Sequence, residues 1–220
     1  MSVVIFPAMA SATPGLRETK KQQTRQEISD TATRLFIERG FEATTIAEIA
    51  EAARVAKKTV TNYFPRKEDL ALDHHEQFVG ALAAAVTARA ADESALDALR
   101  RLFRCAAQDY AADVGFSGPE FSRMLADSPT LTARVRELHE LREQALADVL
   151  PGDDLLRRTA AAQLAAACRL LFQRIQQLQL SGAPRRRVAD TVTAEAERIF
   201  DLLEPAFGEY GRAPRDDSEG

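Results

Sequence analysis

Apolar residues recur at helical spacing in three short segments between residues 24 and 67. In the first segment the apolar side chains share one face, and most charged residues lie off that face. This apolar stripe consists of Ile28, Ala32, Leu35 and Phe36. Gly40 follows it, at the position where a left-handed residue commonly closes a helix. The pattern predicts one amphipathic helix that ends near Gly40.

The second segment begins with a capping box, Thr45-Ile46-Ala47-Glu48. In this motif the Thr45 hydroxyl accepts a hydrogen bond from the Glu48 amide, and the Glu48 carboxylate accepts one from the Thr45 amide. Both bonds satisfy amide groups that the first turn of a helix leaves free. Ile46, Ile49 and Ala50 then recur on one side, so a short helix with one buried face is predicted.

The third segment covers residues 57–64 and ends before Pro65, because proline has no amide donor and disfavours helix in the preceding residue. Val60 and Phe64 are four residues apart and can pack against the first two helices. The residues left on the open side are Lys57, Lys58, Thr61 and Asn62. In a helix-turn-helix, one helix supports a second helix that enters a DNA groove. A supporting helix followed by a helix with short polar and basic side chains fits this pattern.

The rest of the chain carries longer helical periodicities, interrupted by Gly, Pro and Ser. We expect an all-α fold with a flexible arm at residues 1–19, a three-helix helix-turn-helix domain at 20–66, a six-helix domain at 67–207 and a disordered tail at 208–220. The six helices are expected at residues 67–90, 94–114, 119–126, 128–150, 154–180 and 184–207. Ser128-Pro129 is a helix start of the N-cap and N1-proline type.

Charge is distributed unevenly between the two expected domains. Residues 17–72 carry 11 Lys and Arg against 9 Asp and Glu, whereas residues 73–220 carry 18 against 24. All five lysines lie in the first part, and four of them are in or beside the proposed DNA face. These positions favour phosphate contacts by a small head, and the overall net charge of −4 argues against a protein that coats nucleic acid.

Catalytic and metal-binding patterns are not found in the sequence. His74 and His75 are adjacent, and neighbouring helical side chains diverge by about 100°, so the pair does not easily share one ion. The other histidine, His139, is expected to be solvated or packed. Cys105 and Cys168 lie far apart in apolar helical stretches, as reduced core cysteines do. We therefore expect no enzyme activity, no cofactor and no metal.

Membrane and export segments are not expected either. No stretch is apolar over the length of a membrane span. The mildly apolar start, residues 1–10, lacks the basic region of a signal peptide, and Met9 is a possible alternative initiator. The sequence predicts a cytoplasmic protein.

The last two expected helices are apolar around much of their circumference, which requires partners on two sides. In the first of them the stripe is Leu164, Cys168, Leu171, Ile175 and Leu178, widened by Ala161, Ala165 and Phe172. In the last helix it is Val188, Val192, Ala196, Ile199 and Leu203. Burial within one subunit and burial between two subunits both explain the pattern. The two-fold symmetry of many DNA targets favours a homodimer with a four-helix interface.

Three motifs of the head resemble the N-terminal domain of the TetR family of transcriptional regulators. They are F-x-x-x-G-[FY] at residues 36–41, T-[ST]-x-x-x-I-A at 44–50 and T-x-x-x-[YH]-F-x-x-K-x-x-L at 59–70. The resemblance covers about a fifth of the chain. Arg54 and Ala56 depart from it, because the family usually has Gly and Ser there. It implies an all-helical homodimer with a ligand-binding C-terminal domain, usually a repressor.

The family pattern also implies roles for individual residues of the head. Lys57, Lys58, Thr61 and Asn62 would reach the major groove, where Lys can donate to guanine and Asn can pair with adenine. The start of the second helix would touch phosphate, and the third helix and its end would clamp the DNA backbone. The expected DNA-binding set is Thr45, Lys57, Lys58, Thr59, Thr61, Asn62, Tyr63 and Lys67.

A ligand cavity in the helical body would be lined by large apolar residues, which form ordinary core equally well. The candidates are Phe78, Leu82, Phe103, Tyr110, Phe116, Phe121, Met124 and Phe172. Arg104 and Arg174, in apolar helices, are candidate anchors for an anionic ligand. The segment 121–150 also resembles regulator bodies that bind acyl-CoA-like ligands.

The sequence thus predicts a dimeric regulator of palindromic double-stranded DNA that responds to an unknown small molecule and contacts no membrane. A constitutive DNA-binding regulator and a helical protein-interaction adaptor are the alternatives, and an enzyme that uses the helical cavity is a third. Salt-dependent binding to a palindromic promoter fragment separates the first reading from the adaptor and the enzyme. Release by small molecules separates it from the constitutive regulator.

Overall fold

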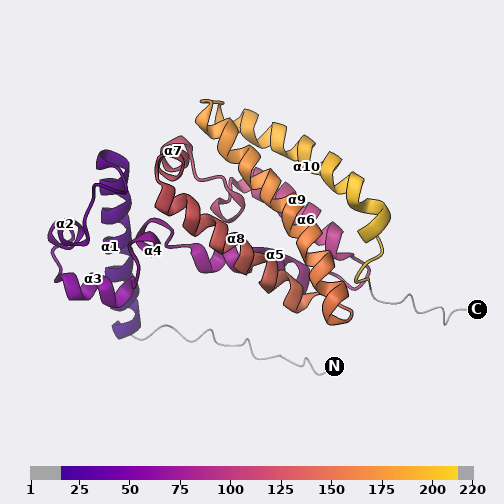
Figure 1. The fold of residues 1–220 in the computed structure, drawn as a ribbon, viewed down its shortest axis with the longest axis horizontal. Helices are drawn as coiled ribbons and strands as arrows, with labels where there is room; N and C mark the ends of the chain where they lie inside the picture. The colour runs from indigo at the N-terminus through magenta and orange to yellow at the C-terminus, as the bar shows by residue number, and fades with distance from the viewer. Residues whose placement is uncertain (1–15, 213–220) are drawn as a thin grey trace, which may run out of the picture.

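The computed structural model describes residues 16–212, and within this range every regular element is a helix. The head consists of α1 (Leu16–Arg39), α2 (Ile46–Ala52) and α3 (Lys57–Tyr63). It lies at one end of an elongated molecule, with the larger helical body beside it (Figure 1). None of the described helices is long and apolar enough to cross a membrane. The expected all-helical fold with an N-terminal helix-turn-helix is confirmed.

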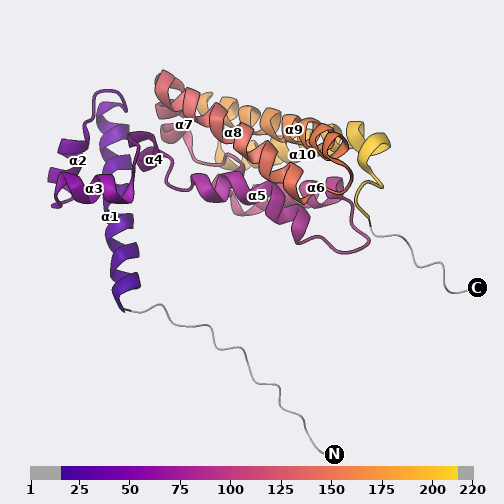
Figure 2. The ribbon, with the colours of Figure 1, turned by 60° about the horizontal axis from the view of Figure 1, so that its bottom comes forward.

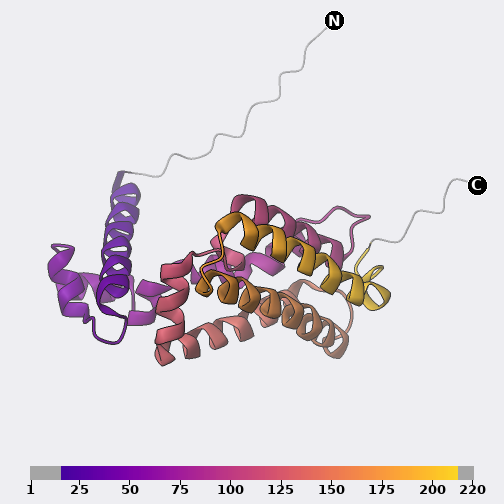
Figure 3. The same cartoon turned by 90° about the horizontal axis from the view of Figure 1, so that it is seen from above.

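Between residues 67 and 207 the structure describes seven α-helices and one short 3₁₀ helix, which form the body. They are α4 (Lys67–Ala71), α5 (His75–Thr87), α6 (Ala95–Asp109), η1 (Ala112–Val114), α7 (Pro119–Asp127), α8 (Pro129–Val149), α9 (Asp154–Leu180) and α10 (Arg185–Phe207). Helices α5 and α8 pack along each other, and α9 and α10 lie side by side on the body (Figures 2 and 3). Ser128 caps α8 by accepting a hydrogen bond from the Leu131 amide at 3.1 Å, as its sequence predicts.

The head has its own apolar core, and the body closes one side of it. Ile28, Phe36, Val60 and Phe64 are fully buried together, which confirms the inward faces expected for α1 and α3. Leu131 of α8 is fully buried in the same cluster, and Met124 and Leu125 of α7 are also part of it. The head is therefore packed onto α7 and α8 as well as being connected through α4.

A single helix over residues 67–90 was expected, and this expectation is wrong. The chain turns at Leu72–His74 and separates α4 from α5. The turn is held from α1, because the Ser29 hydroxyl donates to the Asp73 carboxylate at 2.5 Å and the Arg25 guanidinium donates to the Asp73 carbonyl at 3.2 Å. These bonds offset the helical bonds lost at the turn. Helix α4 is thereby fixed against α1 while α5 follows the body.

Three other expected boundaries also differ. The helix expected at 94–114 ends at Asp109, because Tyr110 adopts a left-handed conformation with φ 55° and the 3₁₀ turn η1 follows. Helix α1 starts at Leu16, inside the expected flexible arm. Residues 208–212, expected in a disordered tail, contact the body: the Tyr210 hydroxyl donates to the Pro151 carbonyl at 2.5 Å, and Arg212 pairs with Asp97 at 3.0 Å. Residues 1–15, including the possible initiator Met9, and residues 213–220 lie outside the described part.

The apolar stripe of α9 is buried inside one subunit. Leu164, Leu171 and Ile175 are completely inaccessible and belong to the core that α6, α9 and α10 share. Their proposed place in a dimer interface is therefore wrong, and burial within the subunit accounts for them. The large apolar side chains that α9 and α10 leave in solvent include Leu170, 57% exposed, and Leu202, 80% exposed.

Candidate DNA-binding surface and ligand cleft

The start of α2 is fixed by the capping box that its sequence predicts. The Thr45 amide donates to the Glu48 carboxylate at 2.8 Å, and the Glu48 amide donates to the Thr45 hydroxyl at 3.2 Å. The Thr45 hydroxyl also donates to the Glu48 carboxylate at 2.8 Å, and this bond together with the one from the Thr45 amide lowers the pKa of Glu48, because both favour its charged form. Thr45 remains exposed at the corner between α1 and α2.

The turn from α2 to α3 contains both departures from the family pattern. Arg54 is left-handed, with φ 56°, although it carries a side chain. Ala56 occupies the N-cap of α3 and offers no side-chain hydrogen bond to it. The turn is closed by main-chain bonds instead, including one from the Val55 amide to the Ala50 carbonyl at 2.9 Å. The backbone thus takes the turn despite the two replacements.

Helix α3 presents polar residues to solvent on its outer side. Lys57, Lys58, Thr61 and Asn62 are exposed, whereas Val60 is fully buried. The Thr61 hydroxyl donates to the Lys58 carbonyl at 3.2 Å. In the described part of the chain, the side chains of Lys57, Lys58 and Asn62 have no hydrogen-bond or ion-pair partner. Helix α3 lies at the end of the molecule away from the body (Figure 2).

The remaining predicted DNA-binding residues are partly buried or already make contacts within the protein. Thr59 and Tyr63 are half-buried. The Lys67 ammonium donates to the Phe41 carbonyl at 2.5 Å and lies 4.3 Å from the centre of the Phe41 ring. Burial lowers the pKa of Lys67, although neighbouring glutamates oppose the shift. In this structure Lys67 fixes the loop between α1 and α2, and its contact with DNA stays a prediction.

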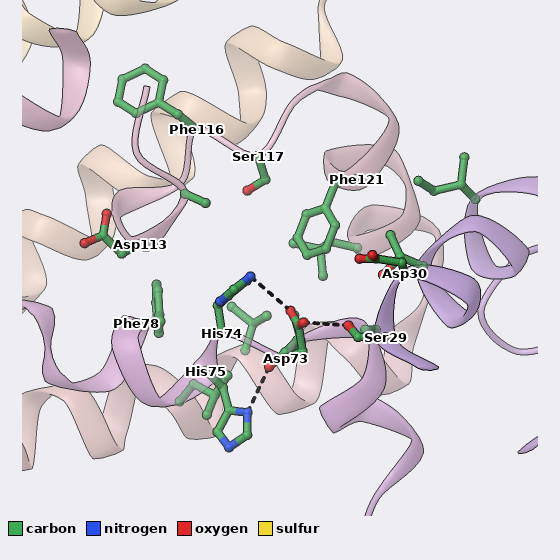
Figure 4. A pocket seen from close by; sticks show the side chains of 18 of the residues that line it. Ser29, Asp30, Asp73, His74, His75, Phe78, Asp113, Phe116, Ser117 and Phe121 are labelled. Atoms are coloured by element: carbon green, nitrogen blue, oxygen red, sulfur yellow. Dashed lines mark hydrogen bonds and ion pairs between the residues drawn. The ribbon is translucent and has the colours of Figure 1, made fainter. Parts of the chain in front are cut away.

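A cleft of about 720 Å³ lies between α1 and the body. Four phenylalanines line it, and polar side chains of α1 and of the α4–α5 turn face them (Figure 4). The phenylalanines are Phe78, Phe116, Phe121 and Phe172. On the α1 side the lining residues are Gln26, Ser29, Asp30, Thr33, Arg34, Ile37 and Glu38. The cleft is thus lined by residues of both the head and the body.

The predicted ligand residues divide between this cleft and the core. Of the eight candidates, the four phenylalanines named above line the cleft. Leu82 and Phe103 are buried in the body core, and Met124 lies in the head cluster beside a second cleft. Tyr110 packs edge-on against Phe116 at 6.1 Å, outside the lining. The sequence could not separate cleft from core because both favour large apolar residues.

The two arginines suggested as anionic anchors form surface ion pairs instead. Arg104 pairs with Glu197 at 2.7 Å, and Arg174 pairs with Glu195 at 2.9 Å. Neither arginine lines the cleft. Their role as ligand anchors is therefore not supported, because each guanidinium already has a carboxylate partner outside the cleft.

The face of α1 in the cleft is not among the ligand-binding residues that the sequence predicts. Its one local signal is Ile37, an apolar residue that lies off the core stripe and is 45% exposed. Ser29 and Asp30 on the same face look like ordinary surface residues in the sequence. Only the position of α5 and α7 opposite α1 turns them into lining residues.

Behind the cleft, His139 and Arg142 are buried against its phenylalanines. The His139 ring lies 5.1 Å from the rings of Phe78 and Phe172, and the Arg142 guanidinium lies 4.4 Å from the centre of the Phe78 ring. Burial and the charge of Arg142 lower the pKa of His139 to about 4. His139 is thus a packed neutral histidine. Among residues 16–212 no three His, Cys, Asp or Glu side chains are grouped as a metal site requires.

Residues 28–73 match the family model described as bacterial regulatory proteins, tetR family. The head therefore carries a TetR-family DNA-binding segment. The chain is 38% identical over 91 residues to the HTH-type transcriptional regulator TcmR of Streptomyces glaucescens. This match covers 41% of this chain and 40% of TcmR. A second relative, the HTH-type transcriptional regulator AcrR of Shigella flexneri, is 45% identical over 56 residues. That match covers 24% of this chain and 26% of AcrR. The matches thus span less than half of either relative.

A likeness in fold to a solved structure extends beyond the matched head. NalD of Pseudomonas aeruginosa, described as the secondary repressor of the MexAB-OprM multidrug efflux pump, superposes with a TM-score of 0.54. The superposition covers 84% of this chain and 97% of NalD at 21% sequence identity. At this identity the likeness concerns the fold, so the ligand and the operator must be argued from this chain's own residues.

Proposed function

We propose that this TetR-family protein is a sequence-specific transcriptional regulator that binds a palindromic operator as a homodimer and is released by a small molecule. The observation that carries the proposal is the outer face of α3, where Lys57, Lys58, Thr61 and Asn62 are exposed. Lysine supplies phosphate or guanine contacts, and the short polar side chains read base edges in the major groove. Because bacterial DNA lies in the cytoplasm, the proposal places the protein there.

Dimerisation is the second part of the proposal. One head offers few phosphate and base contacts, whereas two heads spaced by ~34 Å bind two half-sites on one side of the DNA. The exposed leucines of α9 and α10, Leu170 and Leu202, supply apolar area for a self-complementary contact. A dimer bound over a promoter excludes polymerase, so repression is the expected outcome.

The cleft is the proposed effector site. It is lined by both α1 and the body, so a ligand in it touches the two parts whose relative orientation sets the spacing of the heads. A ligand that fits one orientation better shifts the protein towards it by its differential affinity for the two states. Four of the predicted ligand-binding residues, Phe78, Phe116, Phe121 and Phe172, belong to this proposal.

Operator binding is tested by titrating the full chain into a labelled palindromic fragment taken from its own upstream DNA. Binding should weaken steeply as salt rises, and it should be at least ~10³-fold tighter than binding to a scrambled fragment. Lys57→Ala/Lys58→Ala should weaken binding to both fragments and reduce the salt slope. Arg158→Ala removes an exposed cation on α9 and is the matched control. Equal affinity for the two fragments would contradict sequence-specific regulation.

A further inference from the structure

The charges around the cleft are mostly negative. Its lining contains four carboxylates, one arginine and two histidines. The arginine, Arg34, lies 3.5 Å from one of the carboxylates, Glu38. The three carboxylates left over are Asp30, Asp73 and Asp113. A ligand that enters this cleft therefore meets excess negative charge.

The three aspartates have few direct partners, although the buried Arg142 guanidinium contributes positive charge near Asp113. Asp30 accepts a hydrogen bond from the Gln26 amide at 2.8 Å, and Asp73 accepts one from Ser29 while His74 lies 3.5 Å away. Oxygen Oδ1 of Asp113 is buried and has no hydrogen-bond partner. A buried carboxylate oxygen without a donor is costly, and the positive charge of a bound cation would offset part of that cost.

The aromatic lining lies between these charges. In Figure 4, Asp113 lies beside Phe78 and Phe116 on one side of the cleft, and Asp30 lies near Phe121 on the other. Phenylalanine rings attract cations through their faces and also provide apolar area. Carboxylates and rings together suit a positive charge carried on an apolar or aromatic body.

An anionic ligand fits less well. The buried cation nearest the phenylalanines is Arg142, but it is only 2% exposed, stacks on Phe78 and does not line the cleft. His139 beside it is neutral at physiological pH because burial lowers its pKa to about 4. Carboxylates that do face the cleft would repel a carboxylate or phosphate ligand.

We propose that the cleft between α1 and the body binds a lipophilic organic cation. This inference rests on the cleft being the effector site of the proposed function. The apolar body of the ligand packs on the phenylalanines and supplies most of the affinity. The aspartates supply the selectivity for positive charge. Because Asp30 belongs to α1 and Asp113 to η1, one cation interacts with both the head and the body.

The test uses two probes of nearly the same size and shape but opposite charge, tetraphenylphosphonium and tetraphenylborate. Each is titrated calorimetrically into the full chain without DNA, so the result does not depend on operator binding. Tetraphenylphosphonium should bind once per subunit and at least about tenfold more tightly than tetraphenylborate, as expected for partly screened charges. Equal affinity, or tighter binding of the anion, would overturn the proposal.

Matched variants locate the binding. Asp30→Asn and Asp113→Asn should each weaken tetraphenylphosphonium binding several-fold and leave tetraphenylborate unweakened. Glu140→Gln is the control, because Glu140 is exposed on α8 outside the cleft. Circular dichroism and melting temperature check that each variant is folded. If Asp113→Asn does not fold, Asp30→Asn alone decides, and cation binding that Asp30→Asn leaves unchanged places the probe elsewhere.

The outcomes for this inference and for the proposed function are separable. Charge-selective binding without any operator binding would support the cation site and contradict the regulator. Operator binding without charge-selective probe binding would support the regulator and contradict the cation site.

Discussion

Lys67 stabilises the head in this structure, and its substitution by alanine tests this role separately from a contact with DNA. Lys67→Ala removes the hydrogen bond to the Phe41 carbonyl, so we expect the free energy of unfolding to fall by about 1–2 kcal/mol. Lys58→Ala should leave stability unchanged and lower the salt slope of operator binding by ~1 per subunit. Urea unfolding and anisotropy titrations measure the two quantities. A Lys67→Ala protein of unchanged stability would contradict the structural role.

Arg54 is strained in the turn before α3. A side chain at φ 56° costs ~1–2 kcal/mol, whereas glycine adopts this conformation freely but loses more entropy on folding. We therefore expect Arg54→Gly to raise the free energy of unfolding by up to ~1 kcal/mol. Arg54→Ala is the control, since it removes the charge and keeps the strained Cβ atom. Equal gains in both variants would point to the charge and not to backbone strain.

His139 makes stability depend on pH. Its pKa is about 4 in the folded protein and 6.5 when unperturbed, so below pH 6.5 the unfolded chain takes up a proton that the folded chain excludes. The stability contributed by the neutral ring is complete above pH 6.5 and is lost as pH falls towards 4, by at most ~1.4 kcal/mol per pH unit. His139→Gln should show a shallower loss in urea unfolding between pH 7.5 and 4.5. Parallel curves for the two proteins would exclude this role.

At the scale of elements, α9 has one buried and one free leucine side by side. Leu171 is fully buried in the subunit core, whereas Leu170 is 57% exposed. We expect Leu171→Glu to unfold the body, because it buries an unpaired charge. Leu170→Glu should leave the subunit folded but shift it from dimer to monomer in sedimentation and weaken operator binding. A Leu170→Glu protein that stayed dimeric would place the interface elsewhere.

Local features of the elements could be predicted from the sequence. The capping box of Thr45 and Glu48 and the N-cap at Ser128 depend on residues three apart, and both form. The turn at Asp73 could not be predicted in this way, because its partners Ser29 and Arg25 lie more than forty residues away in the chain. The same holds for the cleft, since the lining face of α1 depends on which helices lie opposite. Residues that contact distant elements carry no local signal.

At the scale of the whole molecule, the head and the body meet at several separate contacts. Ser128 of the body donates to Glu42 of the head at 2.6 Å, Leu131 of α8 is buried in the apolar core of the head, and the cleft lies nearby. Moving the head therefore requires these contacts to change together. An arrangement of this kind favours two discrete orientations over a continuous range, as a ligand-operated switch requires.

The coupling between ligand and operator must be reciprocal. If saturating tetraphenylphosphonium lowers operator affinity by a given factor, saturating operator must lower tetraphenylphosphonium affinity by the same factor, because both report one coupling free energy. A thousandfold effect corresponds to ~4 kcal/mol, and a more typical effect is ~5–150-fold. Calorimetric titration with and without operator, beside anisotropy titration with and without the probe, measures both factors, with scrambled DNA as the control. Unequal factors would mean that the probe also acts outside the cleft. Factors of one for this probe and for a broad panel of other cations would leave a constitutive regulator as the better description.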